Sequence, residues 1–252
     1  MSSQLLTQSL VKDSTFNEYN SSNKWVLAFQ DNGNEDWTNH WFLDGEIATV
    51  TNTDEGMHFV AGPVDGNDAH HAVLWTKKIF EGDLKIEFNY TKTDTRKKNV
   101  TILYIHASGV DKAPFVDDIS VWNDLRKIPS MRMYFNNMDA LHISYAAFTP
   151  DGQEYVRARR YPASDGITFK QTMILPSYDH LDNFFQDGIQ FHITVLKTGN
   201  KLFFQVKGKE TNEIFFWDLS NKAAISNGRI GLRHMFTRSA LYKDFKIYTK
   251  KI

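Results

Sequence analysis

Hydrophobic and polar residues alternate with a two-residue period along most of this chain. Such segments are typical of β-strands with one buried face, and they cover residues 71–80, 83–91, 99–108, 131–137, 141–148, 154–161, 191–199, 201–208, 213–219, 229–236 and 242–250. Turn sequences such as EGD and PDG separate them. Helical periodicity is almost absent, and only residues 117–127 are expected to form a short helix or an ordered loop. The pattern predicts an all-β fold, an antiparallel β-sandwich.

The chain shows no internal boundary. No linker rich in Pro, Gly or Ser divides its 252 residues, and no internal repeat is visible. Sandwich domains often reach this length undivided. We therefore predict one domain over residues 1–252, in which residues 1–30 form an N-terminal extension that the strand pattern does not assign.

The alternation places a set of polar side chains on one face of the predicted sheet. At 141–148, His142 and Ser144 lie opposite Leu141 and Ile143. Other segments contribute to the same face in the same way, with Tyr104, Tyr134, Tyr155, Arg157, Arg159, Tyr161 and Arg233. The third arginine of the ribbon EYVRARRYPA, Arg160, points away from it. If these strands are neighbours, they form a cationic groove.

The composition removes several classes of partner and chemistry. The formal net charge is −1, so no overall field recruits nucleic acid or an anionic membrane. No apolar run approaches the roughly 20 residues of a membrane span. Cysteine is absent, which excludes disulfides, thiol catalysis and cysteine-bound zinc. The start MSSQLLTQSLVKD lacks the features of a signal peptide. We expect a periplasmic or secreted protein if a leader has been removed, and otherwise a cytoplasmic one.

The polar face has the groups needed to bind a sugar carboxylate and to carry out β-elimination beside it. Guanidinium groups bind carboxylates bidentately and stabilise an enolate-like intermediate. In this hypothesis Arg157 and Arg159 hold the carboxylate or a neighbouring sulfate, and Arg233 completes the cationic wall. The base and acid come from His142 and a tyrosine, which is Tyr134 or Tyr161, or Tyr145 if a bulge turns it. Further substrate contacts are predicted for Ser144, His71, Trp75, Tyr104 and Trp122.

Other sites receive less support from the sequence. His70 and His71 lack a third zinc ligand at a diagnostic spacing. Residues 31–36 (DNGNED) resemble the start of a calcium loop without its final glutamate. We therefore predict no metal and no cofactor, and leave room only for a structural calcium. His106 is compatible with the groove or with a structural role at a strand end. A glycoside hydrolase would need two carboxylates on the groove face, and the positions assigned to it contain none.

The chain resembles the YesU-like family, a domain of unknown function. The stretches that carry the resemblance are NVTILYIHASG, ALHISYAAF, YVRARRYP and GRIGLRHMFTRSALYKDFKIY, and together the similarity extends over residues 37–250. It implies the concanavalin-type jelly roll. It also implies a carbon–oxygen lyase that removes water from the uronic acid at the non-reducing end of an ulvan-type oligosaccharide, which gives a 4,5-unsaturated sugar. The alternatives are a polysaccharide lyase proper and a non-catalytic carbohydrate-binding module. Nothing in the sequence indicates the oligomeric state.

Overall fold

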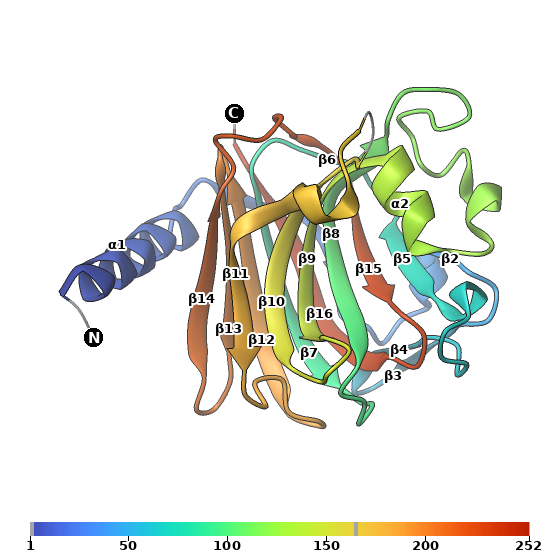
Figure 1. Ribbon diagram of the computed structural model, residues 1–252, viewed down its shortest axis with the longest axis horizontal. Helices are drawn as coiled ribbons and strands as arrows, with labels where there is room; N and C mark the ends of the chain where they lie inside the picture. The colour runs from blue at the N-terminus through green and yellow to red at the C-terminus, as the bar shows by residue number, and fades with distance from the viewer. Residues whose placement is uncertain (1–2, 164–165, 252) are drawn as a thin grey trace.

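Two antiparallel sheets packed face to face form the protein (Figure 1). The computed structural model describes residues 3–163 and 166–251. Sheet I follows the order β14 (Asn212–Asp218), β13 (Lys201–Lys207), β12 (Gln190–Thr198), β7 (Leu84–Lys92), β16 (Ser239–Lys250), β4 (Gly56–Val60) and β3 (Thr49–Thr53), with β1 (Trp25–Asp31) also paired to β16. Sheet II follows the order β11 (Met173–Leu181), β10 (Glu154–Tyr161), β9 (Met138–Phe148), β8 (Asn99–Gly109), β15 (Asn227–His234), β5 (Ala72–Thr76) and β2 (Trp41–Asp44), with β6 (Phe80–Glu81) paired to β15. The predicted antiparallel sandwich is confirmed.

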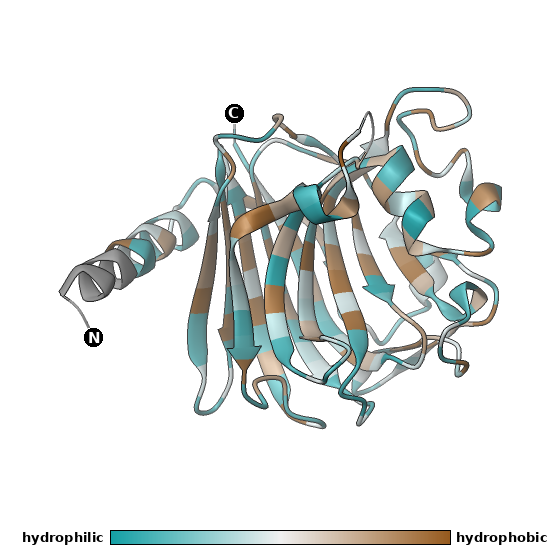
Figure 2. Cartoon of the chain, viewed as in Figure 1, coloured by the Kyte–Doolittle hydropathy of each residue, from teal (hydrophilic) through white to brown (hydrophobic). Residues whose placement is uncertain are grey.

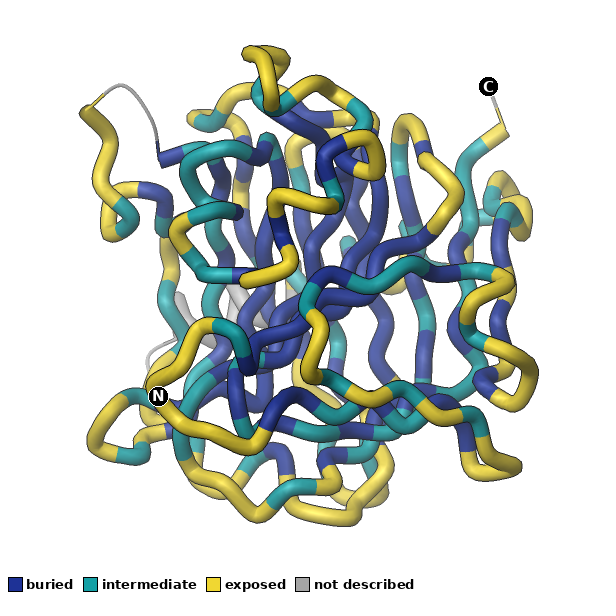
Figure 3. Tube along the Cα trace, turned by 90° about the vertical axis from the view of Figure 1, so that its right-hand side faces the viewer, coloured by how far each residue is buried: buried dark blue, intermediate teal, exposed yellow. Residues whose placement is uncertain are grey.

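The main core lies between the two sheets. Hydrophobic and hydrophilic residues are interspersed along the strands (Figure 2), and the apolar ones from both sheets meet inside, as Leu141 and Ile143 of β9 do with Phe88 of β7. Figure 3 shows the buried strands enclosed by exposed loops. Each large apolar side chain buried in this way contributes roughly 1.5–3 kcal/mol. This core holds the two sheets rigidly, so that the outer face of sheet II can carry other chemistry.

Residues 131–137 form a helix, α2 (Met131–Asn137), where the sequence predicted a strand. The sequence MRMYFNN fits both periods, because Met131, Tyr134 and Phe135 are also spaced as one face of a helix. That helical face packs on the outer face of sheet II, and Tyr134 is fully buried there. The expectation for 117–127 is confirmed, since this segment contains the short 3-10 helix η3 (Asn123–Arg126).

The N-terminal residues form a helix, α1 (Ser3–Asn20), which projects from the sandwich in Figure 1 and leads into β1. Its C-terminal end is attached to sheet I by Phe16, which packs on Phe203 at 5.9 Å between ring centroids. No helix among the described residues is both long and apolar enough to cross a membrane. Three further 3-10 helices are η1 (Trp37–Asn39), η2 (Asp68–His70) and η4 (Phe169–Thr172).

Candidate functional site

The register of sheet II aligns the predicted groove residues in rows across its outer face. One row runs from Arg159 through His142 and Tyr104 to Gly231 and Trp75. The adjacent row contains Arg157, Ser144 and Arg233, in that order across the sheet. The faces assigned from the alternation at 141–148, 154–161 and 229–236 are therefore confirmed.

A glycine lets the aromatic part of this face pack tightly. Trp75 lies across Gly231 of the neighbouring strand, where an added Cβ would come within 2.4 Å of the indole ring. Tyr104 stacks on Trp75 from the other side, at 5.3 Å between ring centroids. Glycine in the middle of a strand often marks such a close approach, and here it fixes the position of two large rings.

His142 stands at the centre of the row between two hydroxyl groups. Its Nδ1 lies 2.6 Å from Tyr161 Oη, and its Nε2 lies 2.6 Å from Ser144 Oγ. The side chain is only 1% exposed. Burial, followed by the charges of Arg159 and Arg233, lowers the pKa of His142 well below its usual value. Burial also raises the pKa of Tyr161 well above its usual value. Both groups are therefore neutral at neutral pH, as a hydrogen-bonded imidazole and phenol.

Arg233 is completely buried and only partly hydrogen-bonded. Its Nη2 donates to Pro129 O at 2.6 Å and to His71 Nδ1 at 2.8 Å, and its guanidinium lies 4.5 Å from the ring centre of Tyr134. Nε and Nη1 have no partner among the described residues. Because a guanidinium only donates, Nδ1 of His71 is the acceptor. Burial, and next the charge of Arg233, lowers the pKa of His71 to about 3.

The two arginines of the β10 ribbon are held differently. Arg157 pairs with Asp179 at 2.5 Å and stacks on Tyr155. Arg159 donates from Nη1 to the carbonyl of Phe169 at 2.8 Å, and its guanidinium lies 4.0 Å from the centre of that phenyl ring. Among the residues that the structure describes, no ion pair includes Arg159 or Arg233. We use the term polar cluster for the group formed by Tyr104, His142, Ser144, Arg159, Tyr161 and Arg233.

Residues 110–137, here termed the cover segment, lie over the aromatic side of the polar cluster. The carboxylate of Asp44, at the end of β2, holds the cover segment against sheet II. Its Oδ2 accepts from Arg126 Nε at 2.5 Å, Tyr134 Oη at 2.8 Å and Trp75 Nε1 at 2.7 Å. Asn123 donates to the other oxygen. One carboxylate thus joins β5, η3 and α2, and the closed cover explains why the cluster is buried except for the half-buried Arg159.

Several sequence-based assignments need correction. Tyr134 does not point from a strand into a groove, since its hydroxyl is bound to Asp44, and burial and Asp44 raise its pKa well above the usual value. Tyr145 faces the core between the sheets, where its hydroxyl lies 3.4 Å from that of Tyr242. Trp75 and Trp122 are buried and offer no open stacking platform. Trp122 instead stacks on Arg126.

Arg160 and His106 do not lie on the outer face. Arg160 points away from it, as predicted, and binds Asp139 and the carbonyl of Ala223. His106 lies at a bulge of β8 with φ 53°, which turns it away from Tyr104. Burial lowers its pKa to about 3, and the charged groups that act on it, Lys197 and Asp83, belong to the sheet I side.

Sequence reasoning missed Asp44, Gly231 and Phe169. The only local signal for Asp44 is a charged residue in an otherwise apolar strand, WFLD, and its partners are 31 to 90 residues away. The proposed calcium loop uses its carboxylates locally: Asp31 accepts from Trp41, and Asp36 caps η1. No cluster of three or more His, Cys, Asp or Glu side chains suited to a metal occurs within the described residues.

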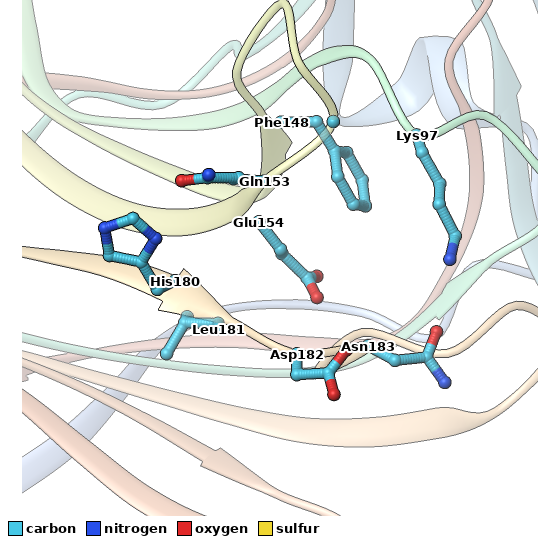
Figure 4. Close-up of a pocket in the computed structure, with 9 residues that line it drawn as sticks. Lys97, Phe148, Gln153, Glu154, His180, Leu181, Asp182 and Asn183 are labelled. Carbon is cyan, nitrogen blue, oxygen red and sulfur yellow. The ribbon is translucent and has the colours of Figure 1, made fainter.

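A pocket separate from the polar cluster, shown in Figure 4, lies at the start of β10, near Glu154. It has a buried carboxylate, Glu154, whose pKa is raised by burial. Both carboxylate oxygens accept from backbone N–H groups, those of Phe184 and Phe185. Glu154 is therefore occupied in holding the loop before β12, and the polar cluster is the better candidate site.

Comparison with solved structures shows the same fold in lectin-like proteins. A protein of unknown function with a galectin-like fold from Bacillus subtilis matches with a TM-score of 0.68 and 14% identity, over 90% of this chain and 100% of that chain. A legume lectin-like domain from Entamoeba histolytica matches with a TM-score of 0.56 and 9% identity, over 90% and 99% of the chains. Lectin I-B4 from Griffonia simplicifolia matches with a TM-score of 0.54 and 8% identity, over 89% and 100%. The concanavalin-like jelly roll expected from the resemblance is thereby confirmed.

The sequence itself identifies the family. No functionally curated protein matches the chain. The family described as "Domain of unknown function (DUF1961)" matches residues 11–247. This match spans nearly the whole sandwich and agrees with the YesU-like resemblance. The chain belongs to the DUF1961 family.

Proposed function

We propose that the outer face of sheet II binds an oligosaccharide through the carboxylate of a uronic acid. The observation that carries this proposal is the pair Arg159 and Arg233, two guanidinium groups on either side of His142 for which the described part of the chain provides no carboxylate partner. Arg233 is completely buried and Arg159 is half-buried, and a buried cation without an anion is costly. The nearby carboxylate of Asp44 is already bound by Arg126. A ligand carboxylate would supply the missing charge.

The fold supports a sugar as the carrier of that carboxylate. Jelly rolls of this type occur in lectins, although a fold alone does not define a function. The outer face also combines the half-buried rings of Phe135, Tyr155 and Phe169 with hydroxyl groups, a mixture that suits sugars because their rings have both apolar and polar faces. Binding without chemistry needs only these features.

Elimination of water is the second candidate function, and the contact between His142 and Tyr161 favours it. One of the pair would take the proton from C5 of the uronate, and the electron pair of the C5–H bond would form the C4–C5 double bond. The C4 hydroxyl would leave as water after receiving a proton from the other group. The arginines at the carboxylate would stabilise the enolate-like intermediate. Were the C4 substituent a sugar, the same chemistry would be that of a polysaccharide lyase.

The bound carboxylate would also change the pKa of His142. Arg159 and Arg233 contribute to the low pKa of His142 in the free protein. Burial is the larger cause of the low pKa and would persist, but a negative charge between the arginines and the imidazole opposes their effect and raises this pKa. Ligand entry would need the ring of Phe169 to leave Arg159, since this ring and its carbonyl occupy the guanidinium.

Calorimetric titration tests the binding proposal. We expect the methyl glycoside of a uronic acid to bind and the matching neutral hexoside to bind much more weakly. Arg159→Gln should weaken uronate binding about 10- to 100-fold, because it removes charge-assisted hydrogen bonds worth about 1.5–3 kcal/mol. Arg96→Gln, an exposed arginine of the β7–β8 loop, is the matched control and should bind normally.

Two results would contradict the proposal. Equal affinity for the uronate and the neutral sugar would remove the role of the carboxylate. An unchanged affinity of Arg159→Gln in a folded protein would remove the role of the arginine. Absorbance of a 4,5-unsaturated uronate, followed with uronate-terminated oligosaccharides, then separates the enzyme from the binding module.

A further inference from the structure

Two basic side chains, one from each sheet, are buried between the sheets at the end of the sandwich where β8 and β12 finish. Lys197 follows Ile193 and Val195 on the core-facing side of β12 and is 5% exposed. His106 enters the same layer from sheet II at the bulge of β8 and is completely buried. Neither residue belongs to the polar cluster, so the proposed function does not use them.

Both groups lack a partner in the described part of the chain. Neither ring nitrogen of His106 has a hydrogen-bond partner there, and Lys197 takes part in no side-chain hydrogen bond or ion pair there. The two groups interact, because the charge of Lys197 follows burial as a cause of the low pKa of His106. Buried polar groups almost always have a partner, and a buried ammonium without one is costly.

The carboxylates of this layer are already bound to other cations. Asp83, whose charge acts on both basic groups, accepts from Lys250 Nζ at 2.7 Å and from the backbone of the turn after β12. Asp139 is paired with Arg160. Two carboxylates therefore balance two of the three cations, and the charge of Lys197 is left without a counter-charge.

The loop at 219–226, which links β14 to β15, crosses over this end of the sandwich (Figure 1). Its Ile225 is buried in the main core, and Arg160 donates to the carbonyls of Ala223 and Ala224. A groove of 710 Å³ opens beside the loop and is lined by the same two alanines and by Arg160. A small ion could enter from this groove, whereas the loop limits the size of what can lie beneath it.

We propose that a small monovalent inorganic anion, such as chloride, binds between Lys197 and His106 and joins the two sheets at this end. An ammonium group only donates, and a neutral imidazole carries one N–H, so each residue can direct a donor at the same anion. One negative charge matches the single cation that has no counter-charge. The guanidinium of Arg160, whose charge acts on Lys197, adds a favourable potential without direct contact.

Urea unfolding of the whole protein at constant ionic strength tests this site, with sodium chloride replaced stepwise by sodium methanesulfonate, whose anion is larger. A ligand that binds only the folded state raises the folding equilibrium constant in proportion to its concentration once this exceeds Kd, so we expect about a tenfold increase for a tenfold increase in chloride. Lys197→Met keeps an apolar stem but no charge, and it should abolish this response. Lys201→Met, at a half-buried lysine of the neighbouring strand β13, is the matched control and should keep it.

A crystal of the wild-type protein grown in sodium bromide gives a second readout that does not depend on a variant. Bromide scatters anomalously, and we expect its density between Lys197 Nζ and the ring of His106. Density absent from that position would overturn the proposal.

Equal responses of wild-type stability to chloride and methanesulfonate would also overturn it, as would an unchanged chloride response in Lys197→Met. Bromide density without any chloride effect on stability would indicate an adventitious ion only, and the proposal would fail. None of these outcomes involves the polar cluster, so the proposed function is tested separately.

Discussion

Asp44→Asn tests whether one carboxylate holds the cover segment on sheet II. The substitution keeps the size of the side chain and one acceptor oxygen, but it removes the negative charge. Arg126, which is 0% exposed, then loses its anionic partner. Removal of one partner from a buried ion pair costs about 3–5 kcal/mol. We expect the free energy of unfolding to fall by an amount in this range.

A second ion pair of the same segment supplies the matched control. Asp118 pairs with Arg229 at 2.8 Å, but its side chain is 41% exposed. Pairs near solvent contribute about 0–1 kcal/mol, so Asp118→Asn should cost no more than about 1 kcal/mol. Urea unfolding of both variants, followed by tryptophan fluorescence, gives the two free energies directly.

Hydrogen exchange shows whether the loss is local. If only the cover opens, amides of η3 and α2 should exchange faster in Asp44→Asn while those of β7 and β12 keep their protection. Equal costs for Asp44→Asn and Asp118→Asn would refute the reasoning. So would recovery of stability by Asp44→Ala, which removes every hydrogen bond that the carboxylate accepts. Arg126→Met in the Asp44→Asn background should restore part of the loss, because it removes the unpaired cation.

Three other predictions follow from the site and its surroundings. His142→Gln should abolish formation of the 4,5-unsaturated product and retain uronate binding, whereas Tyr145→Phe in the core should retain both; loss of product in Tyr145→Phe alone would contradict the assignment. Gly231→Ala should destabilise the protein by about 1–3 kcal/mol in urea, because its Cβ would meet Trp75 at 2.4 Å, and an unchanged stability would refute that contact. The pKa of His71 is about 3 in the folded protein and near 6.5 when unfolded, so the unfolded chain binds more protons between these values. The contribution of His71 to the free energy of unfolding should therefore be complete above about pH 6.5. It should fall as the pH drops toward 3, by at most about 1.4 kcal/mol per pH unit. Urea unfolding at pH 7 and pH 5 should show a smaller difference in this free energy for His71→Gln than for the wild type.

The sequence predicts those features of the site that depend on neighbouring residues along one strand. Alternation places His142, Arg159 and Arg233 on the same face because the two-residue period is set by strand geometry alone. It does not distinguish a strand from a helix at 131–137, where seven residues satisfy both periods. The sequence analysis leaves the sheet order as a condition, because the order that brings His142 beside Tyr104 comes only from the tertiary structure.

The burial of the site could not be predicted from the sequence. The cover segment reaches Asp44 across 79 to 90 residues of chain, and no local pattern reports such a contact. The position of Tyr145 also depended on tertiary structure, because a bulge decides whether it faces the core or the outer face. Alternation places it with Leu141 and Ile143, and only a bulge would turn it outward. The register shift in this part of the sheet comes after Tyr145, which stays among the tyrosines of the core.

The bulge at His106 adds one residue to β8 and reverses the alternation of inward-facing and outward-facing side chains along the strand. Before it, Tyr104 faces outward, and after it Ala107 does, where unbroken alternation would have placed His106. One additional residue thus exchanges an imidazole ring for a methyl group at the edge of the candidate site, and pairing with β9 resumes at Ser108 in a shifted register. Relatives could acquire or lose a basic group on this face by the insertion or deletion of a single residue, with every other side chain of the strand unchanged in identity.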